Sequence, residues 1–365
     1  MKIGILTFHN AINYGAVLQT YATQELLKSM GYEAEVIDYH NRAIDADYER
    51  FEFHVSNMPK KRIWQIPGYL YSCLTYSQRK SKFDRFLADY LNLSPKKYLE
   101  SSIFKLSGFE AILIGSDQVW NKGLTGGHLD EIYWGNIITD SSTKIIAWSI
   151  SINNYNFTSE ELDKIKNYLN NFSKLSLREI KAKEFIESCS DKKAILTLDP
   201  TLVCPRKVWL NLISQCQGNY ILSFSVLDQD KTYALALDLA KYDNSPVKYL
   251  KAYSDRKLKH NVIQNAGPIE FLSYIANSKY VVSGSFHGTV FSIIFHKQFY
   301  SVMYRNSPNN RIVSLLTNLG LQDRIRYFDE PIEPAKQEID YKEIDSKISK
   351  LGKTSVEFIR QSLKA

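Results

Sequence analysis

The sequence predicts an α/β fold made of two Rossmann-like lobes that face each other across a cleft. Three observations support this prediction. The chain has 365 residues, enough for about two domains that each bury a core. Short apolar runs typical of buried strands alternate with segments of helical spacing along most of the chain. Two prolines follow one of these runs near residue 200, which predicts a domain boundary there.

The first lobe opens with a strand, a helix and a second strand. Residues 3–8 form an apolar run, residues 16–30 carry apolar side chains at helical spacing before Gly31, and residues 33–39 form another run. Strands joined through a helix in this way are parallel, as in a doubly wound sheet. Further strands are expected at residues 109–114, 144–149, 175–177 and 194–198, with helices at 159–172 and 178–189.

The same alternation resumes after the prolines and defines the second lobe. We expect an N-terminal lobe over residues 1–204 and a C-terminal lobe over residues 205–340. A helix over residues 341–365 is expected to pack back on the first lobe. The predicted elements of the second lobe are strand 220–226, helix 232–241, strand 247–251, helix 268–276, strand 280–283, helix 289–295 and strand 299–304.

A basic, mainly helical insertion is expected in the first lobe at about residues 45–100. Its residues 59–97 hold nine basic and two acidic side chains, and so account for the whole net charge of +7. Aromatic side chains alternate with these charges, which suits an anionic membrane surface that adds about 1 kcal/mol per basic residue. A helix with a solvated basic face is the alternative. The aromatic residues concerned are Trp64, Tyr69, Tyr71, Tyr76, Phe83 and Phe86.

Several classes of protein are excluded by composition and motif. No apolar stretch approaches the roughly 18–20 residues that span a bilayer, and His9 and Asn10 interrupt any signal-peptide core, so we expect a cytoplasmic location. The four cysteines lie far apart and predict neither a metal site nor a disulfide framework. Dinucleotide, Walker, serine-hydrolase and zincin motifs are absent. No RNA-binding signature accompanies the positive charge, so no nucleic-acid partner is expected.

The most informative stretch is YVVSGSFHGT at residues 280–289. A buried strand ends there, a turn with two glycines follows, and a helix begins at once. The backbone N–H groups of this turn therefore lie at a helix N-terminus beyond the carboxyl end of a strand, where open α/β sheets bind anions. His287 would stand beside the anion and exchange a proton with it, in a crevice where basic groups converge. The alternative is a histidine that caps the turn.

A second polar cluster, GSDQVWN at residues 115–121, follows another predicted strand. Asp117, Gln118 and Asn121 offer hydrogen-bonding groups for sugar hydroxyls, and Trp120 offers an aromatic face. The alternative is that Asp117 caps a helix and Trp120 belongs to the core.

Four motifs occur in order along the chain: FHNAINYGAVLQ at residues 8–19, GSDQVWN, LDPTL at 198–202 and SFHGT at 285–289. Together they resemble the polysaccharide pyruvyl transferase family over residues 1–327, apart from the region 45–100. The resemblance implies a glycosyltransferase-B-like architecture. It also implies transfer of pyruvate from phosphoenolpyruvate to two hydroxyls of a sugar, which gives a cyclic ketal in bacterial polysaccharide biosynthesis, with no cofactor and no metal.

The resemblance implies roles for residues on the donor side. His287 matches the motif histidine and is the candidate acid or base. Arg178 matches an arginine associated with the donor, with an interlobe or surface ion pair as the alternative. Ser285 stands where structurally described relatives carry an arginine, so Arg311 or Arg305 is expected to replace it. The other expected donor contacts come from the turn and helix start, namely Ser285, Phe286, Gly288 and Thr289.

On the acceptor side, Asp117 would orient or deprotonate a sugar hydroxyl. The residues expected to bind the acceptor are His9, Asn13, Tyr14, Gln118, Trp120 and Asn121, with a satisfied core histidine as the alternative for His9. The acceptor is expected on a polyprenyl or nucleotide carrier, the former at the inner membrane face. The other histidines, His40, His54, His128, His260 and His296, show no partner pattern and are expected to be structural. Competing classes are a glycosyltransferase with a nucleotide-sugar donor and a non-catalytic carbohydrate-binding subunit.

Overall fold

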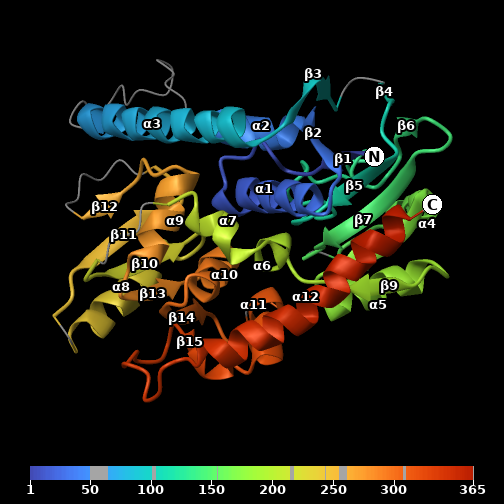
Figure 1. The fold of residues 1–365 in the computed structure, drawn as a ribbon. Coiled ribbons are helices and arrows are strands. Elements are labelled where there is room, and N and C mark those ends of the chain that lie inside the picture. The colour runs from blue at the N-terminus through green and yellow to red at the C-terminus, as the bar shows by residue number, and fades with distance from the viewer. Residues whose placement is uncertain are drawn as a thin grey trace. The chain divides into compact units, whose positions relative to one another are not determined.

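A computed structural model describes residues 1–49, 65–100, 104–153, 155–213, 218–242, 244–254, 261–306 and 310–364, which divide into two compact units (Figure 1). Unit 1 contains Met1–Tyr48, Leu87–Pro205 and Asp345–Ala365, and unit 2 contains Glu49–Phe86 and Arg206–Ile344. Each unit is built on a parallel sheet with helices, which confirms the predicted α/β class. The predicted cleft between the lobes stays a prediction.

Unit 1 has a seven-stranded sheet whose described neighbours are all parallel. Its strands, in sheet order, are β3 (Leu93–Leu99), β2 (Glu33–His40), β1 (Lys2–Leu6), β5 (Ala111–Gly115), β7 (Lys144–Ile150), β8 (Phe172–Leu177) and β9 (Ala194–Leu196). Strands β4 (Lys105–Leu106) and β6 (Ile138–Thr139) form a separate small pair. The helices are α1 (Tyr14–Ser29), α2 (Arg42–Glu49), α4 (Ser159–Leu169), α5 (Ile180–Cys189), α6 (Pro200–Val203) and most of α12 (Tyr341–Leu363).

Both faces of this sheet are packed, because successive side chains of a strand point to opposite faces. Ile112 and Ile114 of β5 belong to one core cluster, while Ala111 and Leu113 belong to another. The second cluster also contains Phe358 of α12, so the C-terminal helix packs on unit 1. Two covered faces explain why these strands are continuous apolar runs in the sequence.

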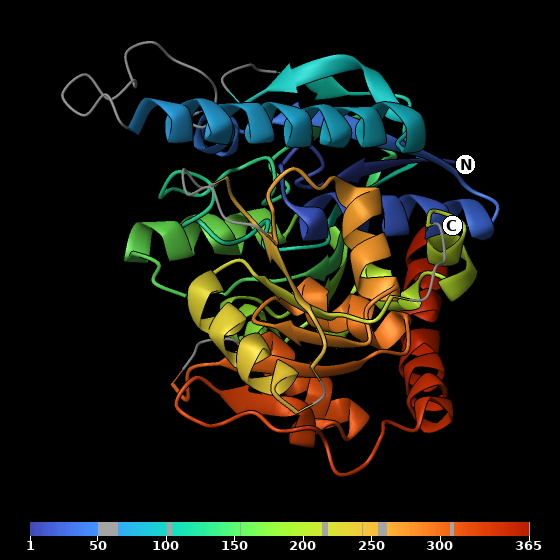
Figure 2. The same cartoon turned by 90° about the vertical axis from the view of Figure 1, so that its left-hand side faces the viewer.

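Unit 2 has a six-stranded parallel sheet. Its strands, in sheet order, are β12 (Val262–Ile263), β11 (Val247–Lys251), β10 (Ile221–Ser225), β13 (Tyr280–Ser283), β14 (Gln298–Met303) and β15 (Ile325–Tyr327). Its helices are α7 (Arg206–Leu210), α8 (Gln229–Ala240), α9 (Pro268–Ala276), α10 (Phe286–Ile294), α11 (Asn310–Leu319) and the short η3 (Gln322–Arg324). Helix α8 packs on the Ile221 face, while Phe224 on the other face contacts Phe271 of α9. Figure 2 shows α8 in yellow and α9 in orange.

The basic insertion differs from the prediction in where it packs. Its long helix, α3 (Ile66–Tyr90), belongs to unit 2 as far as Phe86 rather than to the first lobe. Arg79 is 2% exposed and donates to the carbonyl oxygens of Lys251 (3.4 Å) and Ala252, and Lys82 pairs with Glu270 at 2.7 Å. Arg79 and Lys82 therefore interact with other residues of the protein, whereas the sequence suggested that their charges were solvated.

The aromatic residues of α3 do not form a membrane-facing stripe. Four of the six that suggested this role are buried in the protein, namely Tyr69, Tyr76, Phe83 and Phe86. Their helical spacing therefore reflects core packing. Trp64 lies outside the described residues. Among the described residues, no helix has the length and hydropathy that a membrane span requires.

Gly115, at the end of β5, has no room for a side chain. Its φ is 121°, and a Cβ there would lie 2.2 Å from the backbone oxygen of Trp148 and 2.7 Å from Ile150 Cγ1. We expect Gly115→Ala to lower the free energy of unfolding by about 3 kcal/mol, since the neighbouring strand must move. Gly352→Ala in α12 is the control: nothing lies within 4 Å of its Cβ position, so stability should rise by about 0.5–1 kcal/mol. Urea unfolding followed by fluorescence measures both, and an unchanged Gly115→Ala midpoint would contradict the expectation.

Candidate functional site

Helix α10 begins directly after strand β13, at the carboxyl edge of the unit 2 sheet. Ser285 caps the helix, because its side chain accepts a hydrogen bond from the Gly288 N–H (3.5 Å) and its carbonyl accepts one from Thr289 Oγ1 (3.1 Å). Ser283 Oγ accepts the Ser285 N–H at 3.1 Å. The turn thus sets the positive end of the helix dipole at this edge, as an anion site requires.

The two glycines of the turn are required by close packing. A Cβ at Gly288 would lie 2.1 Å from Ser283 Oγ and 3.1 Å from Phe224 Cδ1, and one at Gly284 would lie 2.5 Å from Ser225 Oγ. Larger residues would therefore push the start of α10 away from strands β10 and β13. The glycine pattern of the sequence is thus a packing requirement of this turn.

His287 lies in the first turn of α10 and is 8% exposed, so it is more enclosed than the open crevice that the sequence predicts. Its ring meets the Phe286 ring edge-on at 5.2 Å. The Arg311 guanidinium of α11 stacks over the same Phe286 ring at 5.2 Å. A histidine, a helix N-terminus and an arginine therefore gather in unit 2, as the donor-site prediction requires.

Arg305, the other expected substitute for the arginine absent at position 285, is held elsewhere. Its guanidinium pairs with Asp329 (3.0 Å) and Glu330 and stacks over Tyr327 at 4.5 Å. Two carboxylates already neutralise this cation. Arg311 is therefore the better-placed of the two candidates.

Arg178 follows β8 at the carboxyl edge of the unit 1 sheet, where its charge is neutralised inside the protein. Its Nη1 lies 2.6 Å from Asp199 Oδ2, and the two side chains are 4% and 0% exposed. Its Nε donates to the Ser149 carbonyl at 2.9 Å, and Nη2 contacts Ser116 Oγ. The guanidinium thus joins the ends of β5, β7 and β8 to the start of α6. These contacts give Arg178 a structural role, and the donor contact expected for it stays a prediction.

The GSDQVWN cluster forms a turn after β5 rather than a capped helix. Asp117 has a φ of 60° and is 9% exposed, and its Oδ1 accepts the N–H of Gln118 at 2.9 Å. Gln118 Oε1 accepts a hydrogen bond from Asn121 Nδ2 at 2.8 Å. The Gln118 and Asn121 side chains therefore contact each other, and the Asp117 carboxylate accepts a backbone N–H of the same turn.

The prediction that Trp120 offers its aromatic face to a sugar is wrong. Its side chain is fully buried, stacks on Trp134 at 4.4 Å and donates from Nε1 to the Tyr133 carbonyl at 2.8 Å. Tyr14, also expected at the acceptor, is 3% exposed. Asn13 caps α1, since its Oδ1 accepts the N–H groups of residues 15 and 16.

His9 lies in the loop after β1 and contacts residues at the end of the neighbouring strand β2. Its Nε2 and the Nε2 of His40 both lie 2.9 Å from Asp38 Oδ1, and His40 Nδ1 lies 2.9 Å from Asp45 Oδ2. Burial alone would lower the pKa of His40, but the bonds to Asp38 and Asp45 outweigh it and raise the pKa to about 9. Burial opposes ionisation of Asp38, yet hydrogen bonds from His40 and His9 hold its pKa well below the usual range.

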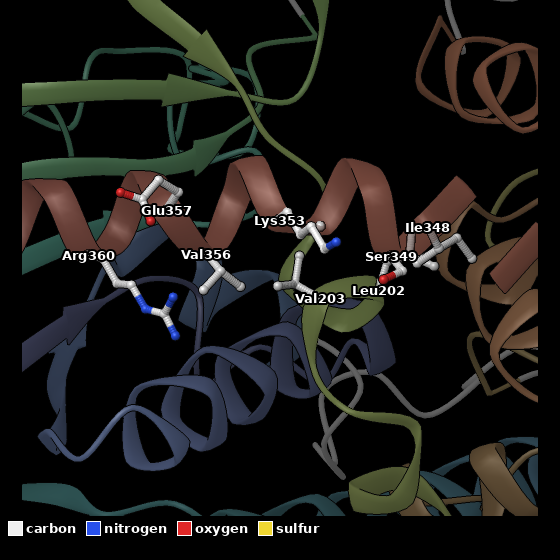
Figure 3. A pocket seen from close by; sticks show the side chains of 9 residues that line it. Leu202, Val203, Ile348, Ser349, Lys353, Val356, Glu357 and Arg360 are labelled. Carbon is white, nitrogen blue, oxygen red and sulfur yellow. The ribbon is translucent and has the colours of Figure 1, made fainter. Parts of the chain in front are cut away.

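A cavity of about 700 Å³ lies elsewhere in unit 1, between α6 and α12 (Figure 3). Its walls combine apolar side chains with the charged Lys353, Glu357 and Arg360 along α12. None of the sequence-predicted site residues lines it. The lining residues are Leu202, Val203, Ile348, Ser349, Gly352, Lys353, Val356, Glu357 and Arg360.

The family model described as polysaccharide pyruvyl transferase matches residues 13–306, most of the chain. The chain belongs to the polysaccharide pyruvyl transferase family. The match includes the β13–α10 turn, the GSDQVWN turn and Arg178, whereas His9 and Arg311 lie outside it. Membership confirms the resemblance drawn from the four sequence motifs.

No curated protein matches the chain significantly. Solved structures that match the chain include UDP-GlcNAc 2-epimerase from Methanocaldococcus jannaschii, at 9% identity, 99% coverage of both chains and a TM-score of 0.47. UGT89C1 of Arabidopsis thaliana has 12% identity, covers 100% of this chain and 99% of its own, and has a TM-score of 0.46. The Streptomyces glycosyltransferase SsfS6 has 11% identity, coverage of 99% and 100%, and a TM-score of 0.42. Likeness at this level does not extend to ligands or reactions.

In this pyruvyl transferase family member, sequence reasoning missed three residues of the His9 cluster. Asp38, His40 and Asp45 were absent from the predicted site, and His40 was expected to have no partner. The sequence did contain an indication of this cluster. Asp38 and His40 are two residues apart at the end of a strand, so they share one face, and this strand was predicted to lie parallel to the strand before His9. His128 and His296 also have partners, in Glu100 and Arg206.

Proposed function

We propose that the chain transfers pyruvate from phosphoenolpyruvate to two hydroxyls of a sugar in a polysaccharide precursor. Membership of the polysaccharide pyruvyl transferase family supports the reaction class. The observation that carries the donor assignment is the grouping of Arg311, Phe286 and His287 at the N-terminus of α10.

This grouping suits a small phosphorylated acid. Phosphoenolpyruvate carries about three negative charges near neutral pH. A helix N-terminus supplies only about 0.3–1 kcal/mol, so a guanidinium such as that of Arg311 is needed to bind the phosphate or carboxylate in a bidentate manner. Arg178 pairs with Asp199, and the proposal does not depend on it for donor binding.

The reaction needs a proton for the methylene carbon of the donor and removal of protons from two sugar hydroxyls. In this proposal His287 delivers the proton to C3, which makes C2 electrophilic toward the first hydroxyl oxygen. The C2–O bond to phosphate then breaks, and the second hydroxyl closes the ketal. Two protons are released by the sugar hydroxyls. One balances the proton added to the methylene carbon to form the methyl group, and the other is carried away on the released phosphate. Asp117 is the candidate base for the acceptor hydroxyl.

Product analysis tests this function. The purified chain is incubated with phosphoenolpyruvate and a panel of nitrophenyl or lipid-linked glycosides, and the products are measured by mass spectrometry and a phosphate assay. We expect one glycoside to gain the mass of pyruvate less water, with one phosphate released per product. Release of a nucleoside diphosphate from a nucleotide sugar, with no use of phosphoenolpyruvate, would overturn the proposal in favour of a glycosyltransferase.

A further inference from the structure

Two histidines and a carboxylate meet at the carboxyl ends of β1 and β2. Nε2 of His9, Nε2 of His40 and an oxygen of Asp38 all lie within 4.8 Å of one another. Both imidazoles direct the same ring nitrogen at Oδ1 of Asp38, at 2.9 Å in each case. The two rings are nearly perpendicular, with centroids 5.9 Å apart, so they converge on the carboxylate from different directions.

We propose that His9, Asp38 and His40 bind a divalent first-row transition metal ion such as Zn²⁺. In tetrahedral coordination by atoms about 2 Å from the ion, ligand atoms lie roughly 3.3 Å apart. Each Nε2 already lies 2.9 Å from Asp38 Oδ1, and the three ligand atoms lie within 4.8 Å of one another. The site is independent of the donor residues in unit 2 and does not rest on the proposed reaction.

The contacts behind the histidines support this assignment. A histidine that binds a metal usually donates its other ring N–H to a carboxylate or a backbone carbonyl, which fixes the ring and its tautomer. His40 Nδ1 contacts Asp45 Oδ2 at 2.9 Å, and His9 Nδ1 faces the Thr7 carbonyl at 3.4 Å. Asn10 Nδ2 lies 2.7 Å from Asp45 Oδ1 and 2.8 Å from His40 Nδ1. Both Nε2 atoms face Asp38 Oδ1, which belongs to the third proposed ligand.

The donor set also predicts the kind of ion and leaves room for another ligand. Imidazole nitrogens favour Zn²⁺, Co²⁺, Ni²⁺ or Fe²⁺ over Mg²⁺, which prefers six oxygen ligands. Three protein ligands leave a fourth position to a water or hydroxyl oxygen, as in metal sites that remain open. Solvent reaches the cluster through Asp38 and His40, whose side chains are 21% and 14% exposed, while His9 is fully buried.

The experiment measures metal binding by the full chain after treatment with a chelator. We expect isothermal titration calorimetry with Zn²⁺ to show one ion bound per chain, and bound Zn²⁺ to raise the thermal unfolding midpoint. Bound Co²⁺ should give a visible absorption band typical of a cobalt ion with a low coordination number. Asp38→Asn and His40→Gln should each weaken binding more than about 100-fold. Asp45→Asn, which removes an outer contact only, should weaken it about 10–100-fold.

His128→Gln is the matched control, because His128 and Glu100 form a histidine–carboxylate pair at 2.8 Å in the same unit, with the imidazole 58% exposed. It should leave stoichiometry and affinity unchanged. Circular dichroism confirms that each variant is folded. Two results would show that the cluster is a hydrogen-bonded network only. One is a wild-type chain that does not bind one Zn²⁺ per chain, and the other is a folded Asp38→Asn chain that binds Zn²⁺ as tightly as wild type.

Discussion

Asp199→Ala is expected to lower the free energy of unfolding by about 3–5 kcal/mol. The substitution removes the partner of Arg178, whose side chain is 4% exposed, and so leaves a buried cation without its counter-charge. It also removes the cap of α6, since Asp199 Oδ1 accepts the N–H and the hydroxyl of Thr201 at 2.9 and 2.6 Å. Chemical unfolding at neutral pH, followed by fluorescence and circular dichroism, gives the change.

Three further variants separate charge from capping. Asp199→Asn keeps an oxygen for the cap and should still lose most of the stability. Adding Arg178→Met to it removes the buried cation and should recover part of the loss. Asp163→Ala is the surface control, because Asp163 pairs with Lys166 at 3.5 Å with both side chains more than half exposed, and should change stability by less than about 0.5 kcal/mol. Equal effects at Asp199 and Asp163 would contradict a buried, stabilising pair.

The sequence predicted most of the sheet strands because a parallel strand covered on both faces is an unbroken apolar run. Residues 33–39 were expected as a strand, and β2 is Glu33–His40. The short edge strands β12 and β15 of unit 2 were not expected. Nor was β3, Leu93–Leu99, which lay inside the segment expected to be a helical insertion. This strand is at the edge of the sheet and contains Pro95, Lys96 and Lys97. Edge strands carry such residues, so their apolar signal is weak.

Burial and pairing explain why the site was predicted less well than the fold. Trp120 beside Asp117 and Gln118 is the same pattern whether the indole meets a sugar or stacks on Trp134. Arg178 would look the same in the sequence whether it held a donor or Asp199, twenty-one residues later. The glycine turn around His287 was predictable, because a helix that starts directly after a strand needs small residues at the junction.

His287→Ala is expected to reduce turnover about 10²–10⁴-fold if this histidine transfers the proton to the donor, with a smaller effect on the KM for phosphoenolpyruvate. The imidazole lies in the first turn of α10, beside the Phe286 ring that Arg311 covers. Steady-state phosphate release with an acceptor identified by product analysis gives kcat and KM. His287→Gln should be as slow as His287→Ala, because a carboxamide fills much of the space but does not exchange protons near neutral pH.

His296→Gln is the control for this experiment, since His296 lies in the same unit but contacts Arg206 and stacks on Tyr341. It should keep kcat within about twofold of wild type. Because His287 is 8% exposed, each variant also needs a thermal unfolding curve, so that loss of packing is not counted as loss of chemistry. A folded His287→Ala chain with normal kcat would remove the imidazole from the reaction, and the donor site would then rest on the helix N-terminus and Arg311 alone.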